Sequence, residues 1–344
     1  MAKLAAKFAE LLPRLWYRRG LSFRLLPLLP LSWLFGAVAG LRRAAYRRGW
    51  LPSERLPVPV VVVGNLIAGG AGKTPLTLWL VEALRARGRR PGIVSRGYGA
   101  STAAPRLVGA DCTPAEVGDE PLLLARRSGV PVAVCRDRVA AAHCLLAAHP
   151  ECDVIVADDG LQHYRLARDV EIALFDSRGA GNGWLLPCGP LREPLSRLRS
   201  VDAVVWNGLP APLPRQAGTA PRFGMRLEGG RFRSLADPAR TCDAAELAGR
   251  PLHALAGIGD PARFFRQLEA LGLAFAAHPF PDHHAYTAAD LAFAAGGVLL
   301  MTEKDAVKCA GLSTGEAWVL PVSAVVDDGL IEKILEKLDG RTAS

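Results

Sequence analysis

Residues 60–75 read VVVVGNLIAGGAGKTP, and this stretch decides the fold. Four valines followed by a glycine-rich turn are typical of a buried parallel strand that ends in a phosphate-binding loop. The turn closes with Gly72, Lys73 and Thr74, as the pattern G-x-x-x-x-G-K-[ST] requires. That pattern also has a glycine at position 67, where this sequence has Ile67. The stretch is therefore a candidate nucleotide site with one departure from the common pattern.

Each part of the loop offers a group that a nucleotide needs. Gly69, Gly70 and Gly72 allow the backbone to fold tightly and to point its N–H groups at phosphate oxygens. Lys73 adds a positive charge, and Thr74 offers a hydroxyl to Mg²⁺ at the start of a helix whose dipole favours anions. The predicted nucleotide contacts are Ile67, Ala68, Gly69, Gly70, Ala71, Gly72, Lys73 and Thr74. A plain strand–helix turn is the alternative, but such a turn does not explain why a lysine occupies position 73.

A phosphate loop needs an acid at the end of a neighbouring strand to hold Mg²⁺. The stretch VIVADDG provides Asp158 and Asp159 after an apolar strand. Adjacent carboxylates repel each other unless a cation neutralises them. One of the two can ligate the metal while the other orients a ligating water, and an exposed acidic turn is the alternative.

The segments around the loop alternate between strand and helix patterns. Apolar runs predict strands within 58–64, 92–99, 130–137, 152–160, 170–176 and 201–208, and helical spacing predicts helices over 73–88 and 137–150. Such alternation predicts an α/β fold with a doubly wound, mostly parallel sheet. Ligands of such sheets bind at the carboxyl ends of the strands.

Composition divides the chain further. Residues 209–221 are rich in Pro and Ala, and two strand-like arms around Gly229-Gly230 indicate a hairpin. We expect a membrane-associating segment at 1–55, a phosphate-loop core at 56–221, a hairpin linker at 222–249 and a smaller α/β domain at 250–344. The seven cysteines form no C-x-x-C pair, which favours reduced thiols over disulfides or zinc.

The basic charge of the chain lies in its first segment. Residues 1–55 contain eleven basic and two acidic side chains, and their net charge of 11 − 2 = +9 equals that of the whole chain. This distribution favours a local anionic partner over nucleic acid, and no protein partner is implied. The apolar run 25–40 is shorter than the roughly 20 residues that span a bilayer, and Pro27 and Pro30 interrupt it. We expect an interfacial element on anionic lipid; a helical hairpin packed on the protein's own core is the alternative.

Several short motifs occur together and in a fixed order. They are GNLIAGGAGKTP (64–75), SRGYG (95–99), GDEP (118–121), RDR (136–138), DDGLQH (158–163), GPLREP (189–194), FPDHHAY (280–286) and TEKDAVK (302–308). Their order and spacing resemble the tetraacyldisaccharide 4′-kinases, the lipid A 4′-kinases of Gram-negative bacteria. The loop of that family also lacks the first glycine, so Ile67 is no departure from it.

The resemblance implies an enzyme that uses ATP and Mg²⁺. Its substrate would be a tetraacylated glucosamine disaccharide 1-phosphate, phosphorylated on the 4′-hydroxyl at the cytoplasmic face of the inner membrane. The implied fold has two α/β domains joined by a short hairpin, with the nucleotide between them.

The resemblance also assigns roles to single residues. Asp119 becomes the base that takes the hydroxyl proton, although an aspartate that opens a helix is ordinarily a cap. His283 follows an aspartate in a proline-flanked loop and becomes the partner of Asp119 if the domains close; His284 is less certain as the functional histidine.

Further residues of the motifs are candidates for charge stabilisation. Arg192 would stabilise the transferred phosphate, and Glu193 would organise the metal together with Thr74, Asp158 and Asp159. The remaining candidates are Arg96, Arg136 and Arg138 for substrate contacts, and Gln162 and His163 for positioning the metal acids.

Two other classes of protein compete with a kinase. One is a deviant phosphate-loop ATPase of the partitioning or metallochaperone type, whose signature places a lysine where this chain has Ala68. The other is a membrane scaffold with a nucleotide-sensing domain.

Overall fold

The computed structural model describes residues 12–18, 20–100, 104–211, 213, 217–312 and 315–342. The first eleven residues and position 19 of the predicted membrane segment lie outside the described residues. The chain divides into two compact units. The first unit contains residues 1–93, 150–226 and 326–344, and the second contains residues 94–149 and 227–325.

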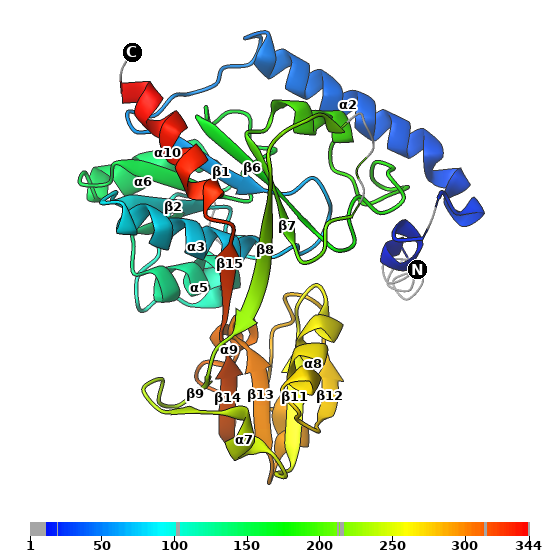
Figure 1. The fold of residues 1–344 in the computed structure, drawn as a ribbon, viewed down its shortest axis with the longest axis vertical. Coiled ribbons are helices and arrows are strands. Elements are labelled where there is room, and N and C mark those ends of the chain that lie inside the picture. The colour runs from blue at the N-terminus through cyan, green and yellow to red at the C-terminus, as the bar shows by residue number, and fades with distance from the viewer. Residues whose placement is uncertain are drawn as a thin grey trace. The chain divides into compact units, whose positions relative to one another are not determined.

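A parallel sheet forms the centre of the first unit (Figure 1). Six neighbouring strands of this nine-stranded sheet follow one another in the order β8 (Arg222–Gly229), β7 (Ala203–Asn207), β6 (Val170–Asp176), β1 (Val60–Gly64), β5 (Val154–Asp158) and β2 (Pro91–Ser95). Strand β1 pairs in parallel with β5 on one side and β6 on the other. Every residue of these two neighbours and of β1 is buried, which is why their sequences are mostly apolar. The predicted doubly wound, mostly parallel sheet is confirmed.

Helices and 3-10 turns complete the first unit. They include η1 (Phe23–Leu28), α2 (Leu29–Arg47), α3 (Lys73–Ala86), η2 (Leu195–Ser200) and α10 (Gly329–Thr342). Helix α3 buries Leu76, Leu80, Val81 and Leu84, whose spacing predicted it. Helix α10 returns to the same unit, where Glu332 forms an ion pair with Arg87 at 2.6 Å.

The second unit is built on its own sheet. The strand order is β10 (Thr241–Cys242), β9 (Phe232–Ser234), β14 (Glu316–Leu320), β13 (Val298–Thr302), β11 (Leu252–Ala256) and β12 (Ala276–Pro279). Its helices include α7 (Ala244–Leu247), α8 (Pro261–Ala270), η4 (Ala289–Ala294) and α9 (Glu303–Cys309). Residues Phe264, Leu268, Leu300 and Trp318 form part of its core.

The segment 94–149 also belongs to the second unit. It contains α4 (Pro114–Val117), α5 (Asp119–Ser128), α6 (Arg138–Ala148) and the antiparallel strands β3 (Arg106–Leu107) and β4 (Val132–Val134). Leu122 and Val117 of this segment share an apolar cluster with Val307 of α9. The chain leaves the second unit along β15 (Val322–Val326).

The two arms around Gly229-Gly230 are strands, but they do not pair with each other as a hairpin. Strand β8 pairs in parallel with β7, whereas β9 pairs with β14 and β10. The reason is packing, because Met225 of β8 and Phe232 of β9 are buried in different units. The prediction of a hairpin from the glycine pair is corrected accordingly.

The two prolines of the N-terminal segment do not interrupt its helix as predicted. Pro27 lies inside η1, and Pro30 lies at the start of α2, where a missing N–H costs nothing. Residues Phe23–Arg47 together are long and apolar enough to cross a membrane by length and composition, and only 11% of the most apolar window is buried.

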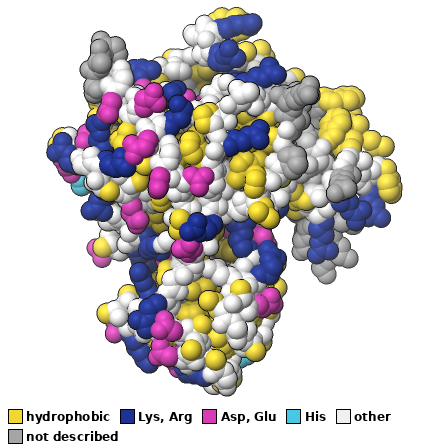
Figure 2. All heavy atoms as spheres, in the orientation of Figure 1, with side chains coloured by type: hydrophobic (Ala, Val, Ile, Leu, Met, Phe, Trp, Pro, Cys, Tyr) yellow, Lys and Arg dark blue, Asp and Glu magenta, His cyan; other side chains and the backbone are white. Residues whose placement is uncertain are grey.

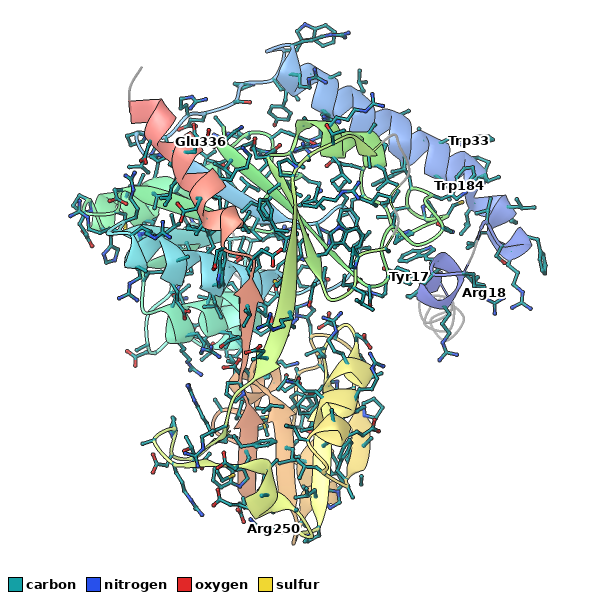
Figure 3. The ribbon with its side chains drawn as sticks, viewed as in Figure 1. Tyr17, Arg18, Trp33, Trp184, Arg250 and Glu336 are labelled. Atoms are coloured by element: carbon teal, nitrogen blue, oxygen red, sulfur yellow. The ribbon has the colours of Figure 1, made fainter. Side chains whose placement is uncertain are left out.

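Helix α2 has two faces. Ser32 is buried and donates a hydrogen bond to the Leu185 carbonyl oxygen at 2.8 Å, and Gly36 lies on the same face against the Leu185 side chain. The other face carries exposed apolar side chains, namely Leu31, Leu34, Val38 and Leu41. Figure 2 shows hydrophobic side chains gathered along the edge of the molecule where α2 lies, and Figure 3 shows Trp33 on this helix.

Candidate active site

The loop between β1 and α3 has the backbone of a phosphate cradle. Gly69 and Gly72 adopt left-handed conformations, with φ of 99° and 98°. A Cβ atom at Gly72 would lie 2.5 Å from the Asn207 side-chain nitrogen, so this position accepts only glycine. Helix α3 begins directly afterwards at Lys73 and has no side-chain cap. The start of α3 therefore offers backbone N–H groups and a positive dipole to an anion.

Three side chains that sequence analysis missed hold this loop by its carbonyl groups. Asn65 donates to the oxygen of residue 69, Arg178 to that of residue 70 and Asn207 to that of residue 71, at 3.0, 2.6 and 3.0 Å. Asn65 directly follows the buried strand β1, and Asn207 is the last residue of the buried strand β7. These positions at strand ends are the sequence pattern that could have indicated them. Fixing the carbonyl oxygens fixes the orientation of the peptide groups between them.

Ile67 and Ala68 occupy the part of the loop where the common pattern has its first glycine. Ile67 is fully buried and forms a bridge to Leu191, and the N–H of Ala68 donates to the Pro190 carbonyl at 2.7 Å. An isoleucine at this position therefore packs the loop against the segment that carries Arg192.

The acids at the end of β5 lie within reach of the loop lysine. Asp159 has an unusual left-handed backbone, with φ of 49°, and its carboxylate lies 3.6 Å from Lys73 Nζ and 3.3 Å from Arg192 Nη1. Asp158 is buried and accepts a hydrogen bond from Thr77 Oγ1 at 3.3 Å. The structure thus brings together Lys73, Asp159 and Arg192.

Glu193 is buried beside this group and bonded to its own chain. It accepts hydrogen bonds from Gln162 Nε2 at 3.3 Å and from the Tyr164 hydroxyl, and Arg197 lies 3.8 Å away. Burial, followed by the charge of Glu193, raises the pKa of Tyr164 to about 12. Gln162 also donates to the Asn65 carbonyl at 3.2 Å, which links Glu193 to the phosphate loop.

The donor set suits a magnesium ion that arrives with phosphate. Within the described residues, no group of three or more His, Cys, Asp or Glu side chains is arranged to hold a metal. Mg²⁺ needs no such cage, because it binds through one or two carboxylates, water and substrate phosphates. Asp158 and Asp159 would supply the carboxylates, and the buried Asn65 Oδ1 atom has no hydrogen-bond partner among the described residues.

The second unit contains a separate acid–histidine pair. Asp119 is the first residue of α5 and is only 5% exposed. The Nδ1 atom of His283 lies 3.1 and 3.2 Å from its two carboxylate oxygens. Gly118 is the N-cap residue of α5, so the alternative interpretation of Asp119 as a helix cap does not hold. Both residues belong to one compact unit, and their contact requires no closure of the two units.

The pair has an unusual backbone conformation at His283 and shifted pKa values at both residues. His283 adopts a left-handed backbone with φ of 60°; it and Asp159 are the two described non-glycine residues with positive φ. Such conformations cluster at functional sites. The hydrogen bond that His283 donates to Asp119 raises the pKa of His283 against the opposing effect of burial. Burial alone would raise the pKa of Asp119, but the bond from His283 and the Lys304 charge outweigh it and lower that pKa.

The other candidates are placed as follows. His284 lies 3.4 Å from Asp290 and not beside Asp119. Arg96 and Arg136 are exposed, whereas Arg138 is buried at the start of α6. Tyr98, which sequence analysis did not single out, lies with its ring centroid 4.8 Å from that of His283.

The glycine cradle, Lys73 and the acids that end the neighbouring parallel strand define a phosphate-loop nucleotide-using protein. The family model described as "Tetraacyldisaccharide-1-P 4'-kinase" matches residues 24–339. This chain belongs to that family.

Relatives and a solved structure agree with this assignment. The chain is 58% identical to tetraacyldisaccharide 4'-kinase of Dechloromonas aromatica, over 97% of this chain and 98% of that protein. It is 57% identical to the kinase of the same name from an Azoarcus species, over 95% of each chain. The structure of LpxK from Aquifex aeolicus in complex with ATP is similar, with a TM-score of 0.78 and 31% identity over 91% of this chain and 98% of that one. These comparisons give no support to an ATPase of the partitioning or metallochaperone type.

Proposed function

We propose that this enzyme transfers the γ-phosphate of ATP to the 4′-hydroxyl of a tetraacyl glucosamine disaccharide 1-phosphate. The observation that carries the proposal is that one chain holds both kinds of group such a transfer needs. A phosphate cradle carries Lys73 beside Asp159, and a hydrogen-bonded acid–histidine pair is formed by Asp119 and His283. An enzyme that only hydrolyses ATP needs no pair of this kind for an alcohol acceptor.

The phosphate loop binds and orients the nucleotide. Residues 67–74 contact its phosphates, Lys73 neutralises charge on the β and γ groups, and Arg192 stabilises the charge of the phosphate in transfer. Mg²⁺, when bound, neutralises phosphate charge and would be held by Thr74, Asp158 and Asp159. Glu193 acts at this site through Gln162, to which it is hydrogen-bonded.

The acid–histidine pair moves the acceptor's proton. Asp119 accepts the proton of the 4′-hydroxyl as the oxygen attacks phosphorus, and His283 orients the carboxylate through its Nδ1 atom. A carboxylate by itself is a weak base near pH 7, since its usual pKa is about 4. Positioned proton transfer of this kind contributes roughly 10²–10⁴-fold to a rate. Arg96, Arg136 and Arg138 are the proposed contacts to the substrate's phosphate and sugars.

The exposed face of α2 brings the enzyme to its lipid substrate. Leu31, Leu34, Val38 and Leu41 are each more than half exposed and lie on the side of the helix away from the buried Ser32. Arginines occur before and after the apolar run, which suits an anionic lipid surface. We place the enzyme at the cytoplasmic face of the bacterial inner membrane, attached through this segment without crossing the bilayer.

The membrane contact is tested by flotation with anionic vesicles. Replacing the four exposed positions by serine should remove most of the bound protein, while the fold is retained because Ser32 and Gly36 still pack on Leu185. A matched control replaces Leu271, an exposed leucine of the second unit, by serine and should bind as the parent does. Equal flotation of the fourfold variant and the parent would refute this part of the proposal.

ADP release measured with and without acceptor separates the three classes of function. A kinase releases ADP only when the acylated disaccharide 1-phosphate is present, an ATPase releases it alone, and a scaffold with a nucleotide sensor releases none. We expect acceptor-dependent release in the parent and its loss in Lys73→Ala. Release at the same rate without acceptor would reject the proposed function.

A further inference from the structure

Lys304 lies at the centre of the charges that surround the acid–histidine pair. Its Nζ atom is 3.0 Å from Glu120 Oε1, 3.0 Å from Asp282 Oδ1 and 3.8 Å from Asp119 Oδ2. The same atom lies 3.5 Å from His283 Nε2, the ring nitrogen that does not face Asp119. Its side chain is 15% exposed. All these residues belong to the second unit.

The position of Lys304 is fixed by the helix that carries it. Helix α9 is capped by Thr302, which accepts a hydrogen bond from the N–H of Asp305. Asp305 is fully buried and accepts further bonds from the Gly257 N–H at 3.1 Å and the Tyr286 hydroxyl at 2.9 Å. The lysine therefore projects from a rigid base toward the pair.

We propose that Lys304 is a positioning residue that sets the protonation of the pair by donating to His283 Nε2. A protonated lysine is only a donor, so the Nε2 atom that faces it must be an acceptor. The imidazole then carries its proton on Nδ1 and donates it to Asp119. His283 stays neutral and Asp119 stays ionised, which is the state that accepts a proton from a hydroxyl group. The usefulness of this protonation state for catalysis rests on the proposed function. The protonation state itself can be measured without substrate.

The local charges show what Lys304 opposes. Helix α5 presents Asp119 and Glu120, and the loop of His283 presents Asp282, whose Oδ2 atom lies 3.8 Å from Nε2. Carboxylates on both sides of an imidazole favour the doubly protonated ring. Lys304 is the cation of α9 that contacts all three acids, and Lys308, one turn further along, forms an ion pair with Asp305. Without Lys304 the ring would take up a second proton and hold Asp119 in an imidazolium ion pair.

The test compares Lys304→Met with Arg127→Met. Arg127 is a matched control because it also joins α5 to α9, through an ion pair with Glu303, is 17% exposed and has no contact with the pair. The first readout is the nitrogen NMR spectrum of the His283 imidazole in the protein without substrate. We expect an Nδ1–H tautomer in the parent and in Arg127→Met, and an imidazole pKa higher by about one unit in Lys304→Met.

The second readout is the pH dependence of kcat/KM. In Lys304→Met the acid limb should move to higher pH by the same amount, so activity at pH 7 falls about tenfold and recovers at pH 9. Lys304→Arg should restore most of it. If Lys304→Met does not fold, Lys304→Met with Glu120→Gln removes one charge of each sign and should shift the pKa in the same direction.

The experiment distinguishes a failure of the proposed role of Lys304 from a failure of the proposed function. An imidazole whose tautomer and pKa are unchanged in Lys304→Met overturns the role of Lys304, whatever the activity. A shift of the same size in Arg127→Met also overturns it, because it would show a general effect of loosening α5 from α9. A parent that shows the predicted tautomer but no acceptor-dependent ADP release would reject the proposed function alone.

Discussion

Asp119→Asn removes the charge that faces His283 and keeps the shape of the side chain. The hydrogen bond that Asp119 accepts is the largest influence that raises the pKa of His283, whereas burial and Lys304 both lower it. The variant should therefore bring the imidazole pKa from above 6.5 to 6.5 or below. Because the acid that we propose to accept the hydroxyl proton is lost, turnover should fall by roughly 10²–10⁴-fold.

The sign of the effect on stability follows from the two pKa shifts. The raised pKa of His283 contributes stability that is fully present below about pH 6.5 and is lost as the pH rises through the higher folded value. The lowered pKa of Asp119 contributes stability that is present above about pH 4 and is lost as the pH falls through the lower folded value. The pair thus stabilises the fold most between about pH 4 and 6.5.

The size of the loss is set by the contacts of Asp119. A hydrogen bond to a charged group contributes about 1.5–3 kcal/mol. The Asp119 side chain is 6% exposed, but that of His283 is 29% exposed, which places the expected loss toward the lower end. We expect Asp119→Asn to lower the free energy of unfolding by about 1.5 kcal/mol at pH 6 and by less at pH 9.

The assays are urea unfolding at the two pH values, NMR titration of the imidazole and acceptor-dependent ADP release. Asp290→Asn is the matched control, because Asp290 faces His284 at 3.4 Å in the same part of the chain and has no role in the proposed chemistry. An unchanged imidazole pKa, together with an equal loss of stability at pH 6 and pH 9, would refute the reasoning.

Three further predictions concern the first unit. Lys73→Ala and Thr74→Ala should each lower phosphoryl transfer by about 10²–10³-fold in ADP release assays, and activity within a few-fold of the parent in both would remove the phosphate-loop assignment. Asp158→Ala and Asp159→Ala should each shift the magnesium titration of activity to higher concentration, and two unchanged curves would show that the metal is held elsewhere. Binding to anionic vesicles should weaken as salt rises from about 0.05 to 0.5 M, because residues 1–55 carry the net charge; flotation that is independent of salt would contradict a role for the arginines.

The phosphate loop could be predicted from sequence because its signals are local. A buried strand, four glycines and Lys73 lie within sixteen residues, and the interpretation of each depends on its sequence neighbours alone. The acids Asp158 and Asp159 were predicted by the same logic, since the ends of adjacent parallel strands meet at one edge of a sheet. The structure places Asp159 beside Lys73 accordingly.

The supporting residues could not be predicted, because they depend on contacts between distant parts of the chain. Arg178 reaches the loop from 108 positions away, and nothing in the residues around it indicates this. Lys304 belongs to the motif TEKDAVK, but its position beside Glu120 depends on the packing of α9 against α5, which the motif does not indicate. The hairpin failed for a related reason, because a glycine pair permits a turn but does not choose the partners of the flanking strands.

The most direct measurement of the central claim is a phosphorus–proton correlation spectrum of the reaction product. The enzyme is incubated with ATP, Mg²⁺ and the acylated disaccharide 1-phosphate, and the lipid product is compared with that from Lys73→Ala and Asp119→Asn. We predict a new phosphate monoester coupled to the proton on the 4′ carbon in the parent and its near absence in both variants. A phosphate on another hydroxyl group, or release of inorganic phosphate without a phosphorylated lipid, would contradict the account.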